Sequence, residues 1–198
     1  MNLALFDFDG TITTRGTFPG FMRVAVLPAK RAVGNVLFAP LVLGYKLGFI
    51  SGSDIRARVT RFAFRGVAAD EVRRAGQEFA RDVLPDLLRP SAIERIQWHK
   101  NQGDVVVIVS GAFDVYLSPW CAQHQLDLIC SQLEVVVGTL TGRYRGAQCV
   151  NAEKSRRIRE KYDLEKFLNV YAYGDTKEYM DMLNLATERY FRWEKCPE

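Results

Sequence analysis

Short runs of consecutive hydrophobic residues alternate along the chain with stretches in which hydrophobic residues recur every three or four positions. The first run, at residues 3–6, ends at an aspartate, and the strongest, at residues 104–111, contains five consecutive β-branched residues. Uninterrupted apolar runs of this length predict strands buried on both faces of a parallel sheet. Further strands are predicted at residues 126–130, at residues 168–173 and in the RYFRW segment, with a hairpin at residues 132–137 and 140–144.

Helical periodicity fills the intervals between these strands. Residues 17–84 carry no strand signal, and within them Val72, Ala75 and Phe79 fall at helical spacing, with Asp70 available as the N-cap. Shorter helices are predicted at residues 90–101, 114–124, 151–162 and 178–186.

Strands that alternate with helices indicate βαβ crossovers, and therefore an α/β fold built on a doubly wound parallel sheet. The long helical block falls between the first and second strands of this core. We therefore expect a core domain formed by residues 1–13 and 87–198, and an inserted helical cap formed by residues 14–86.

The overall composition excludes several classes of protein. With 198 residues, 48% of them hydrophobic and 25% charged, the chain is expected to form one core with room for an inserted subdomain. The net charge of +4 is too small to indicate a nucleic-acid partner. The four cysteines form no CxxC pattern and no zinc-ligand spacing with the two histidines. No signal-peptide pattern opens the chain, so the expected location is the cytoplasm.

The charge is unevenly distributed. Residues 14–66 carry nine basic side chains against one acidic side chain, Asp54, so this stretch has a charge of +8 and the remainder −4. The same stretch is hydrophobic at residues 33–50, but Pro40 and Lys46 interrupt the run and argue against a transmembrane span. A basic, apolar helical region can lie on the inner face of an anionic membrane or close over an anionic substrate. The alternative is a pair of helices packed together with solvated basic faces.

Reactive side chains follow three of the predicted strands. Asp7 and Asp9 come after the first, Ser110 ends the second and Asp175 follows a later one. Ligands of open α/β sheets bind at the carboxyl ends of the strands. Two close carboxylates repel each other unless a cation lies between them, and Mg²⁺ prefers such oxygen ligands. A hydroxyl group and a backbone N–H at a helix start, as at Ser110 and Gly111, can bind an anion.

The order of these motifs resembles that of the haloacid dehalogenase superfamily. The residues that carry the resemblance are the DFDGT string, Ser110, Lys154 in the NAEKS string, and the GD pair that ends at Asp175. The helical block resembles the cap of the phosphoserine-phosphatase-like branch, subfamily IB, and the strings VSGAFDVYL and LEVVVGTLTGR extend this similarity.

The resemblance implies a phosphatase mechanism. Asp7 would attack phosphorus and form an aspartyl-phosphate, while Asp9 would act first as general acid and then as general base. Ser110, the N–H of Gly111 and Lys154 would bind the phosphoryl oxygens. The implied ligands of Mg²⁺ are the Asp7 carboxylate, the Asp9 backbone carbonyl and Asp175.

Two positions depart from the family pattern. A second acid usually follows four residues after Asp175, where this chain has Tyr179, and Glu178 is the nearest substitute that could support the metal through hydrogen bonds. Phosphoserine phosphatases also carry a glutamate nine residues after the nucleophile, where this chain has Gly16. Arg58, in contrast, resembles the arginine that binds the substrate carboxylate. Phosphoserine is therefore the disfavoured alternative substrate.

The basic, hydrophobic insert is similar to that of phosphatidylglycerophosphatase C enzymes, which implies a phosphate carried on a lipid. A soluble sugar or polyol phosphate fits equally well. The expected function is hydrolysis of a small-molecule or lipid phosphomonoester with Mg²⁺ as cofactor and without a nucleic-acid partner. The alternative is a catalytically weak module that binds phosphate or a phosphoprotein; Tyr179 favours it, and the presence of the other motif residues opposes it.

Overall fold

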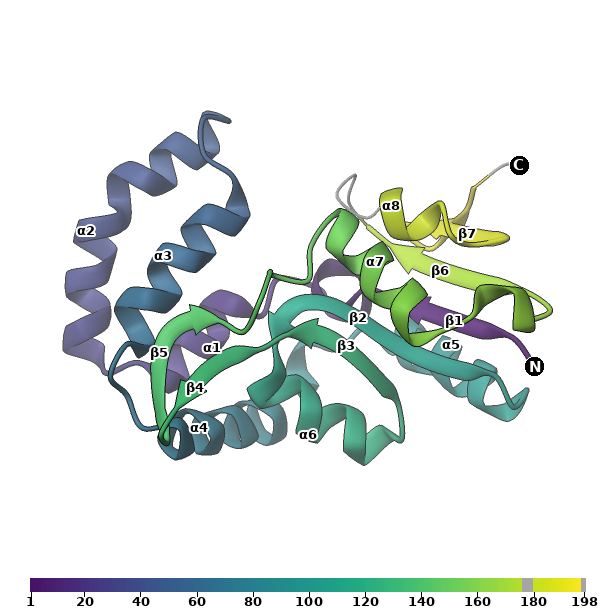
Figure 1. Cartoon of the computed structure of the whole chain (residues 1–198), viewed down its shortest axis with the longest axis horizontal. Helices are drawn as coiled ribbons and strands as arrows, with labels where there is room; N and C mark the ends of the chain where they lie inside the picture. Colours follow the sequence, from purple (N-terminus) through teal and green to yellow (C-terminus); the bar gives the residue numbers. More distant parts are fainter. Residues whose placement is uncertain (176–179, 197–198) are drawn as a thin grey trace.

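The computed structural model describes residues 1–175 and 180–196, and within these residues six strands form one sheet in the order β3-β2-β1-β6-β7-β8 (Figure 1). Neighbouring strands are parallel except for β8, which is antiparallel to β7. The strands are β1 Leu3–Phe6, β2 Val105–Phe113, β3 Asp127–Ser131, β6 Val170–Gly174, β7 Glu188–Phe191 and β8 Glu194–Lys195. The chain leaves β1 toward β2 on one side and later reaches β6 on the other, so the topological switch point lies beside β1.

Helices cover both faces of this sheet. On one face, Ala4 and Phe6 of β1 share a hydrophobic cluster with Ile96 of α5 and Trp120 of α6. On the other face, Leu3 and Leu5 share a second cluster with residues of α7 and α8. These helices are α5 Pro90–Asn101, α6 Asp114–His124, α7 Ala152–Lys161 and α8 Met180–Leu183, with short helical turns η2 Pro85–Leu87 and η3 Leu164–Lys166. The predicted doubly wound α/β fold is confirmed.

Four helices separate β1 from α5, as the absence of a strand signal predicted. They are α1 Phe18–Ala25, α2 Pro28–Lys46, α3 Gly52–Phe64 and α4 Ala69–Asp82. In Figure 1, α2 and α3 lie side by side away from the sheet, whereas α4 runs along α6. The contact between α4 and α6 is so close that a Cβ at Gly76 would lie 2.3 Å from the carbonyl oxygen of Val115. The hydrophobic cluster is continuous between these helices and the sheet, and the division into residues 1–13 and 87–198 against 14–86 stays a prediction.

The predicted hairpin is confirmed, but it lies outside the main sheet. Strands β4 Leu133–Val136 and β5 Thr139–Tyr144 pair antiparallel, and the turn between them has positive φ at Val137 and Gly138. The hairpin packs on the junction between α3 and α4. There Gly66 donates its N–H to the carbonyl of Leu140 at 2.9 Å, and Leu140 donates to Val67 at 2.8 Å.

This hairpin also corrects the expected start of α4. Ala68, and not Asp70, is the N-cap, and Asp70 lies in the first turn, where it pairs with Arg73. The reason is that the hairpin fixes the backbone before the helix: Ala68 bridges Thr139, and the N–H of Ala69 donates to Gly138 at 2.9 Å. A carboxylate in the first turn still complements the helix dipole.

Among the described residues, no helix combines the length and hydropathy that a membrane crossing requires.

Candidate active site

Asp7 follows β1 directly and lies at the carboxyl end of the sheet. Its N–H donates to the carbonyl of Tyr173 in β6 at 3.0 Å, which continues the parallel ladder beyond the strand. Lys154, in the first turn of α7, donates from Nζ to Asp7 Oδ1 at 2.5 Å, and both side chains are buried. The two residues are 147 positions apart, so the fold brings together the first and third predicted motifs. A buried ion pair adds little to stability after desolvation, which favours a functional reason for this one.

The loop after Asp7 lies against the end of a second strand, β6. This loop, η1 Phe8–Ile12, contains Gly10 with φ of 83°, in the left-handed region that favours glycine. A Cβ at Gly10 would lie 2.0 Å from Asp175 Oδ2, so only glycine allows the carboxylate at the end of β6 to approach this loop. The loop that carries Asp7 and Asp9 therefore lies against Asp175 at the switch point of the sheet.

This carboxylate cluster has the properties of a cation site. Asp7 Oδ2 and Asp175 Oδ1 are buried without a hydrogen-bond partner among the described residues. Burial raises the pKa of Asp7, with a further upward contribution from Asp9 that Lys154 opposes. Burial and the charge of Asp7 raise the pKa of Asp175. Carboxylate oxygens left in this state suit a hard cation such as Mg²⁺.

The side chains alone do not form a complete set of metal ligands. Within the described residues, no three side chains of the types His, Cys, Asp and Glu gather at one point. The ligand set implied by the resemblance to the haloacid dehalogenase superfamily needs only two carboxylates, because its third member is the backbone carbonyl of Asp9. Glu178 and Tyr179, which bear on the metal site, lie outside the described residues.

Asp9 is held by two residues that the sequence motifs did not indicate. Asp9 Oδ1 accepts hydrogen bonds from the N–H of Thr17 at 2.8 Å and from Thr17 Oγ1 at 2.7 Å. The hydroxyl of Tyr116, in α6, lies 2.8 Å from Thr17 Oγ1. Burial raises the pKa of Asp9, while the Thr17 donors and the charge of Arg56 lower it. A carboxyl group with a raised pKa suits acid–base chemistry.

Ser110 and Gly111 lie at the same edge of the sheet, but within β2 and not at a helix start. Phe6 pairs with Ile108, which places Ser110 at the level of the Asp7 loop. The pairing of β2 with β3 shifts between Ser110 and Phe113, and Ser110 Oγ accepts from the N–H of Ala112 at 3.1 Å. The expected strand end is therefore replaced by a bulge, a device that re-aims side chains next to active sites.

The structure turns Arg56, rather than Arg58, toward this site. Arg58 is exposed on α3, whereas Arg56 is half-buried and its Nη1 would lie 3.7 Å from a Cβ at Gly111. Arg56 Nε and Gln148 Oε1 are both buried without a hydrogen-bond partner in the described part of the chain, and the Gln148 amide donates to Ser53 at 2.9 Å. Both arginines stand in the string IRAR, and only the orientation of the helix distinguishes them.

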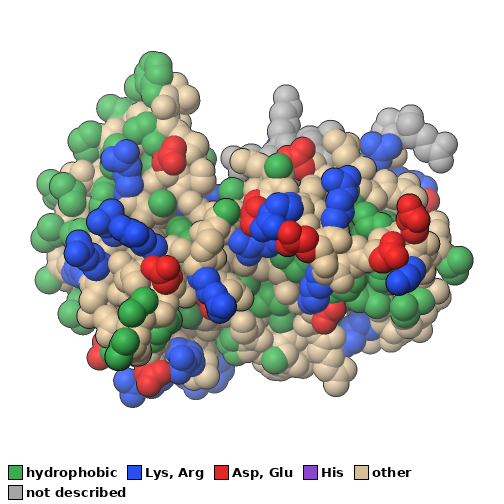
Figure 2. All heavy atoms as spheres, viewed as in Figure 1, with side chains coloured by type: hydrophobic (Ala, Val, Ile, Leu, Met, Phe, Trp, Pro, Cys, Tyr) green, Lys and Arg blue, Asp and Glu red, His purple; other side chains and the backbone are tan. Residues whose placement is uncertain are grey.

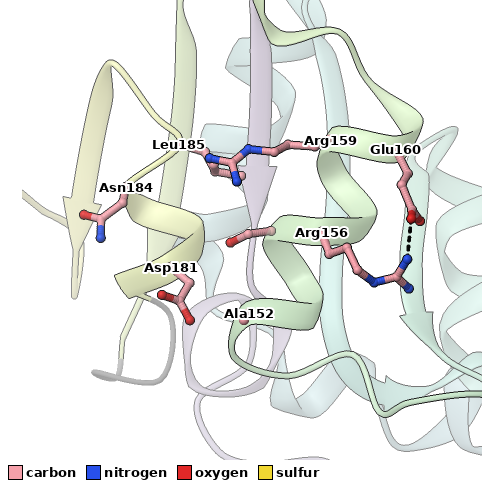
Figure 3. A pocket seen from close by; sticks show the side chains of 8 residues that line it. Ala152, Arg156, Arg159, Glu160, Asp181, Asn184 and Leu185 are labelled. Carbon is pink, nitrogen blue, oxygen red and sulfur yellow. Dashed lines mark hydrogen bonds and ion pairs between the residues drawn. The ribbon is translucent and has the colours of Figure 1, made fainter.

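A pocket of about 520 Å³ between α7 and α8 lies outside this group (Figure 3). The α7 residues that line it are mostly exposed and include the buried Ser155, but Lys154 is not among them. Its basic lining residues are Arg156 and Arg159, of which Arg156 pairs with Glu153 and Glu160. None of the Asp7, Asp9, Ser110, Lys154 and Asp175 side chains lines this pocket, so the candidate active site is the group around Asp7.

The chain is similar to known proteins over nearly its whole length. The sequence profile of the haloacid dehalogenase-like hydrolases matches residues 4–182. The chain is 29% identical over 196 residues to protein CicA of Caulobacter vibrioides (strain NA1000 / CB15N), covering 96% of this chain and 85% of CicA.

Solved structures show the same fold. A protein with unknown function from Bordetella pertussis Tohama I matches with a TM-score of 0.83 and 21% identity, over 96% of this chain and 89% of that one. A phospho-aspartyl intermediate analogue of phosphoserine phosphatase matches with a TM-score of 0.65 and 23% identity, over 96% of this chain and 85% of that one.

Proposed function

Because this chain belongs to the family of haloacid dehalogenase-like hydrolases, we propose that it is a Mg²⁺-dependent phosphatase that forms an aspartyl-phosphate on Asp7. The observation that carries the proposal is the buried contact of 2.5 Å between Lys154 Nζ and Asp7 Oδ1 at the end of the central strand. The other carboxylate oxygen of Asp7 lacks a hydrogen-bond partner within the described residues. A buried carboxylate that is held by a lysine at one oxygen, with its other oxygen available, can act as a nucleophile.

In the first step, the Asp7 carboxylate attacks phosphorus, and the bond between phosphorus and the ester oxygen breaks. Asp9 gives its proton to the departing alkoxide. In the second step, Asp9 takes a proton from water, the resulting hydroxide attacks phosphorus, and inorganic phosphate leaves Asp7. Thr17 holds Asp9 through both steps, because its two hydrogen bonds go to the same carboxylate oxygen.

Phosphoryl transfer requires mainly positioning and charge stabilisation. We assign the binding of phosphoryl oxygens to Ser110, the N–H of Gly111 and the ammonium of Lys154. When bound, Mg²⁺ would be held by the Asp7 carboxylate, the Asp9 carbonyl and Asp175, and would neutralise negative charge on the phosphate. The unpartnered oxygens of Asp7 and Asp175 support this assignment.

The substrate in this proposal is a small-molecule or lipid phosphomonoester. A lipid phosphate would be reached by peripheral contact of the basic, apolar helices with the inner face of a membrane, from the cytoplasmic side. We assign the binding of the alcohol part of the substrate to Arg56 and Gln148, because each has a buried polar atom without a hydrogen-bond partner among the described residues. Phosphoserine stays the alternative, supported by the shared fold and opposed by Gly16, which offers no carboxylate for the ammonium.

The test is hydrolysis of p-nitrophenyl phosphate by the wild type, by Asp7→Asn and by Asp86→Asn, a control at an exposed aspartate. We expect turnover in the wild type and the control, and a loss of more than about a thousandfold in Asp7→Asn. Beryllofluoride with Mg²⁺ should add to Asp7 of the wild type. Residual activity of Asp7→Asn within about tenfold of the wild type would reject the nucleophile. Phosphate binding without turnover in the wild type would instead support the alternative, a phosphate-binding module.

A further inference from the structure

Exposed hydrophobic side chains are concentrated on α2 and the turn that follows it. In the described part of the chain, ten of the sixteen large hydrophobic side chains that are exposed fall between residues 24 and 49. Figure 2 shows them along the left margin and upper tip of the molecule, where Figure 1 places α2 and its following turn. Such a cluster on one element differs from the scattered hydrophobic residues of ordinary surfaces and marks an interaction site.

Five of these side chains, together with Pro40, form a stripe on one side of α2 that ends at its C-cap, Leu47. Gly34 is the one buried residue of α2, all of which is described, and it faces Phe62 of α3, whose ring also contacts Phe38. The opposite side of the helix carries hydrophobic residues at the spacing of one helical face. This α2 stripe consists of Val33, Val36, Leu37, Pro40, Leu43 and Leu47, each of them exposed. The contact with α3 therefore leaves a complete hydrophobic face of α2 uncovered by the described residues.

A groove beside the stripe continues this hydrophobic surface. It has a volume of about 630 Å³, lies between α1, α2 and α3, and is lined mainly by apolar side chains such as Val42 and Ile55. Its basic lining residues are Arg23, Arg31 and Lys46. Hydrophobic surface and positive charge are thus presented together.

The charge of this region selects the kind of partner. Residues 10–53 contain five basic side chains and no aspartate or glutamate. An anionic partner is therefore complementary to this surface, whereas a second copy of the chain would bring two positively charged faces together. Lysine and arginine side chains beside a hydrophobic helical face are the pattern of helices that lie in the interface of an anionic bilayer.

We propose that the α2 stripe, the adjoining groove and Phe49 dock on the surface of an anionic lipid bilayer. α2 lies in the plane of the interface, the stripe enters the boundary between headgroups and acyl chains, and Arg23 and Lys46 contact lipid phosphates. Phe49, 83% exposed in the turn after α2, inserts beside them. This docking surface rests on the peripheral membrane contact named in the proposed function and specifies its residues, which are separate from the Asp7 group.

The experiment is co-sedimentation with two kinds of vesicle at low salt: phosphatidylglycerol and phosphatidylcholine in equal parts, or phosphatidylcholine alone. The test variant is Val36→Glu/Leu37→Glu, and the matched control is Val137→Glu/Leu168→Glu, which changes the same charge at two exposed hydrophobic positions away from α2. We expect the wild type to bind the anionic vesicles at least about tenfold more tightly than the neutral ones. Binding should fall about tenfold in the test variant and stay unchanged in the control.

A second pair of measurements separates the role of charge from that of folding. Arg23→Gln/Lys46→Gln should weaken binding to anionic vesicles and reduce its salt dependence. Hydrolysis of soluble p-nitrophenyl phosphate should be equal in the wild type and all three double variants. The proposal is overturned if the wild type does not bind anionic vesicles at low salt, or if the control loses as much binding as the test variant. It is also overturned if the wild type forms a dimer that does not bind vesicles, and if Val36→Glu/Leu37→Glu dissociates this dimer.

Discussion

Thr17 donates two hydrogen bonds to a single oxygen of Asp9, one from its backbone N–H at 2.8 Å and one from its hydroxyl at 2.7 Å. The hydroxyl proton of Thr17 is thereby used, so the hydrogen bond with Tyr116 must run from the Tyr116 hydroxyl to Thr17 Oγ1. Burial raises the pKa of Tyr116 well above its usual range, and the phenol therefore keeps this proton. Thr17 is the N-cap of α1, so the proposed acid–base carboxylate of the sheet loop is oriented by the first helix of the proposed cap.

We predict that Thr17→Val lowers kcat about tenfold with little change in KM, because loss of the hydroxyl leaves Asp9 with a single donor. Thr17→Ser retains the hydroxyl and should restore most of the activity. Steady-state kinetics with a soluble phosphomonoester measures both. Equal kcat in the valine variant and the wild type would show that the hydroxyl does not position Asp9.

Mg²⁺ should be required for turnover and should also stabilise the fold. Removal of Mg²⁺ with EDTA should abolish activity, and its return should restore it. Because a ligand that binds only the native state raises stability by mass action, Mg²⁺ should raise the Tm of the wild type. Asp175→Asn should shift both responses to higher Mg²⁺ concentrations, since Asp175 Oδ1 is a buried oxygen without a hydrogen-bond partner in the described part of the chain. A wild-type Tm that is the same with Mg²⁺ and with EDTA would argue against the metal site.

Arg56 and Arg58 provide a matched pair on one helix. Arg56→Gln should reduce kcat/KM about tenfold, because its guanidinium faces Gly111 and its charge lowers the pKa of Asp9. Arg58→Gln should change kcat/KM less than about twofold, since this side chain is exposed. Kinetics of the two variants on the same phosphomonoester distinguishes the assignments. A larger effect at Arg58 would restore the residue that the sequence favoured.

The stability of the fold should fall as the pH decreases from 7, because of a buried group at the far end of β2. The imidazole of His99 lies 2.8 Å from Asp104 Oδ2 and 2.9 Å from the Tyr173 hydroxyl. Burial lowers the pKa of His99. Burial also pushes the pKa of Asp104 upward, but hydrogen bonds from His99 and Asn2 outweigh it and leave that pKa below its usual value.

The pKa values of His99 and Asp104 are both lower in the native state than in the unfolded chain. In the unfolded chain, His99 becomes protonated below a pH of about 6.5 and Asp104 below a pH of about 4. In the native state each residue takes up its proton only at a lower pH, so acid favours the unfolded chain. The free energy of unfolding should therefore decrease from pH 7 to pH 5 through His99, and more steeply at lower pH through Asp104. Urea unfolding at several pH values measures this. His99→Gln should flatten the first part of the curve, and an unchanged slope in that variant would exclude His99 as its source.

The elements of the core and the main site residues could be predicted because their signals are local. The DFDGT string follows a strand that is buried on both faces, and parallel strands bring their carboxyl ends to one edge. The contact between Asp7 and Lys154, which are 147 positions apart, could be expected only from the resemblance to the haloacid dehalogenase superfamily. The roles given to these residues, and the boundary of the cap, stay predictions.

The remaining features depend on contacts between distant segments. Thr17 and Tyr116 are 99 positions apart, and no spacing in the sequence connects them with Asp9. The choice between Arg56 and Arg58 depends on which face α3 turns toward the core, which its three arginines, spread around the helix, do not reveal. Aspartate is a residue type favoured at N-caps, but the helix begins before Asp70 because the hairpin fixes the backbone at Ala68.

The hairpin of β4 and β5 has a consequence for how the protein is made. Gly66, Val67 and Ala69 obtain their backbone partners from residues 138–140, which leave the ribosome some seventy residues later. The turn between α3 and α4 must therefore stay solvated during that part of translation, even though the helices on either side of it have emerged. A nascent chain arrested before the hairpin would expose this junction to proteases, whereas one arrested after it would be protected.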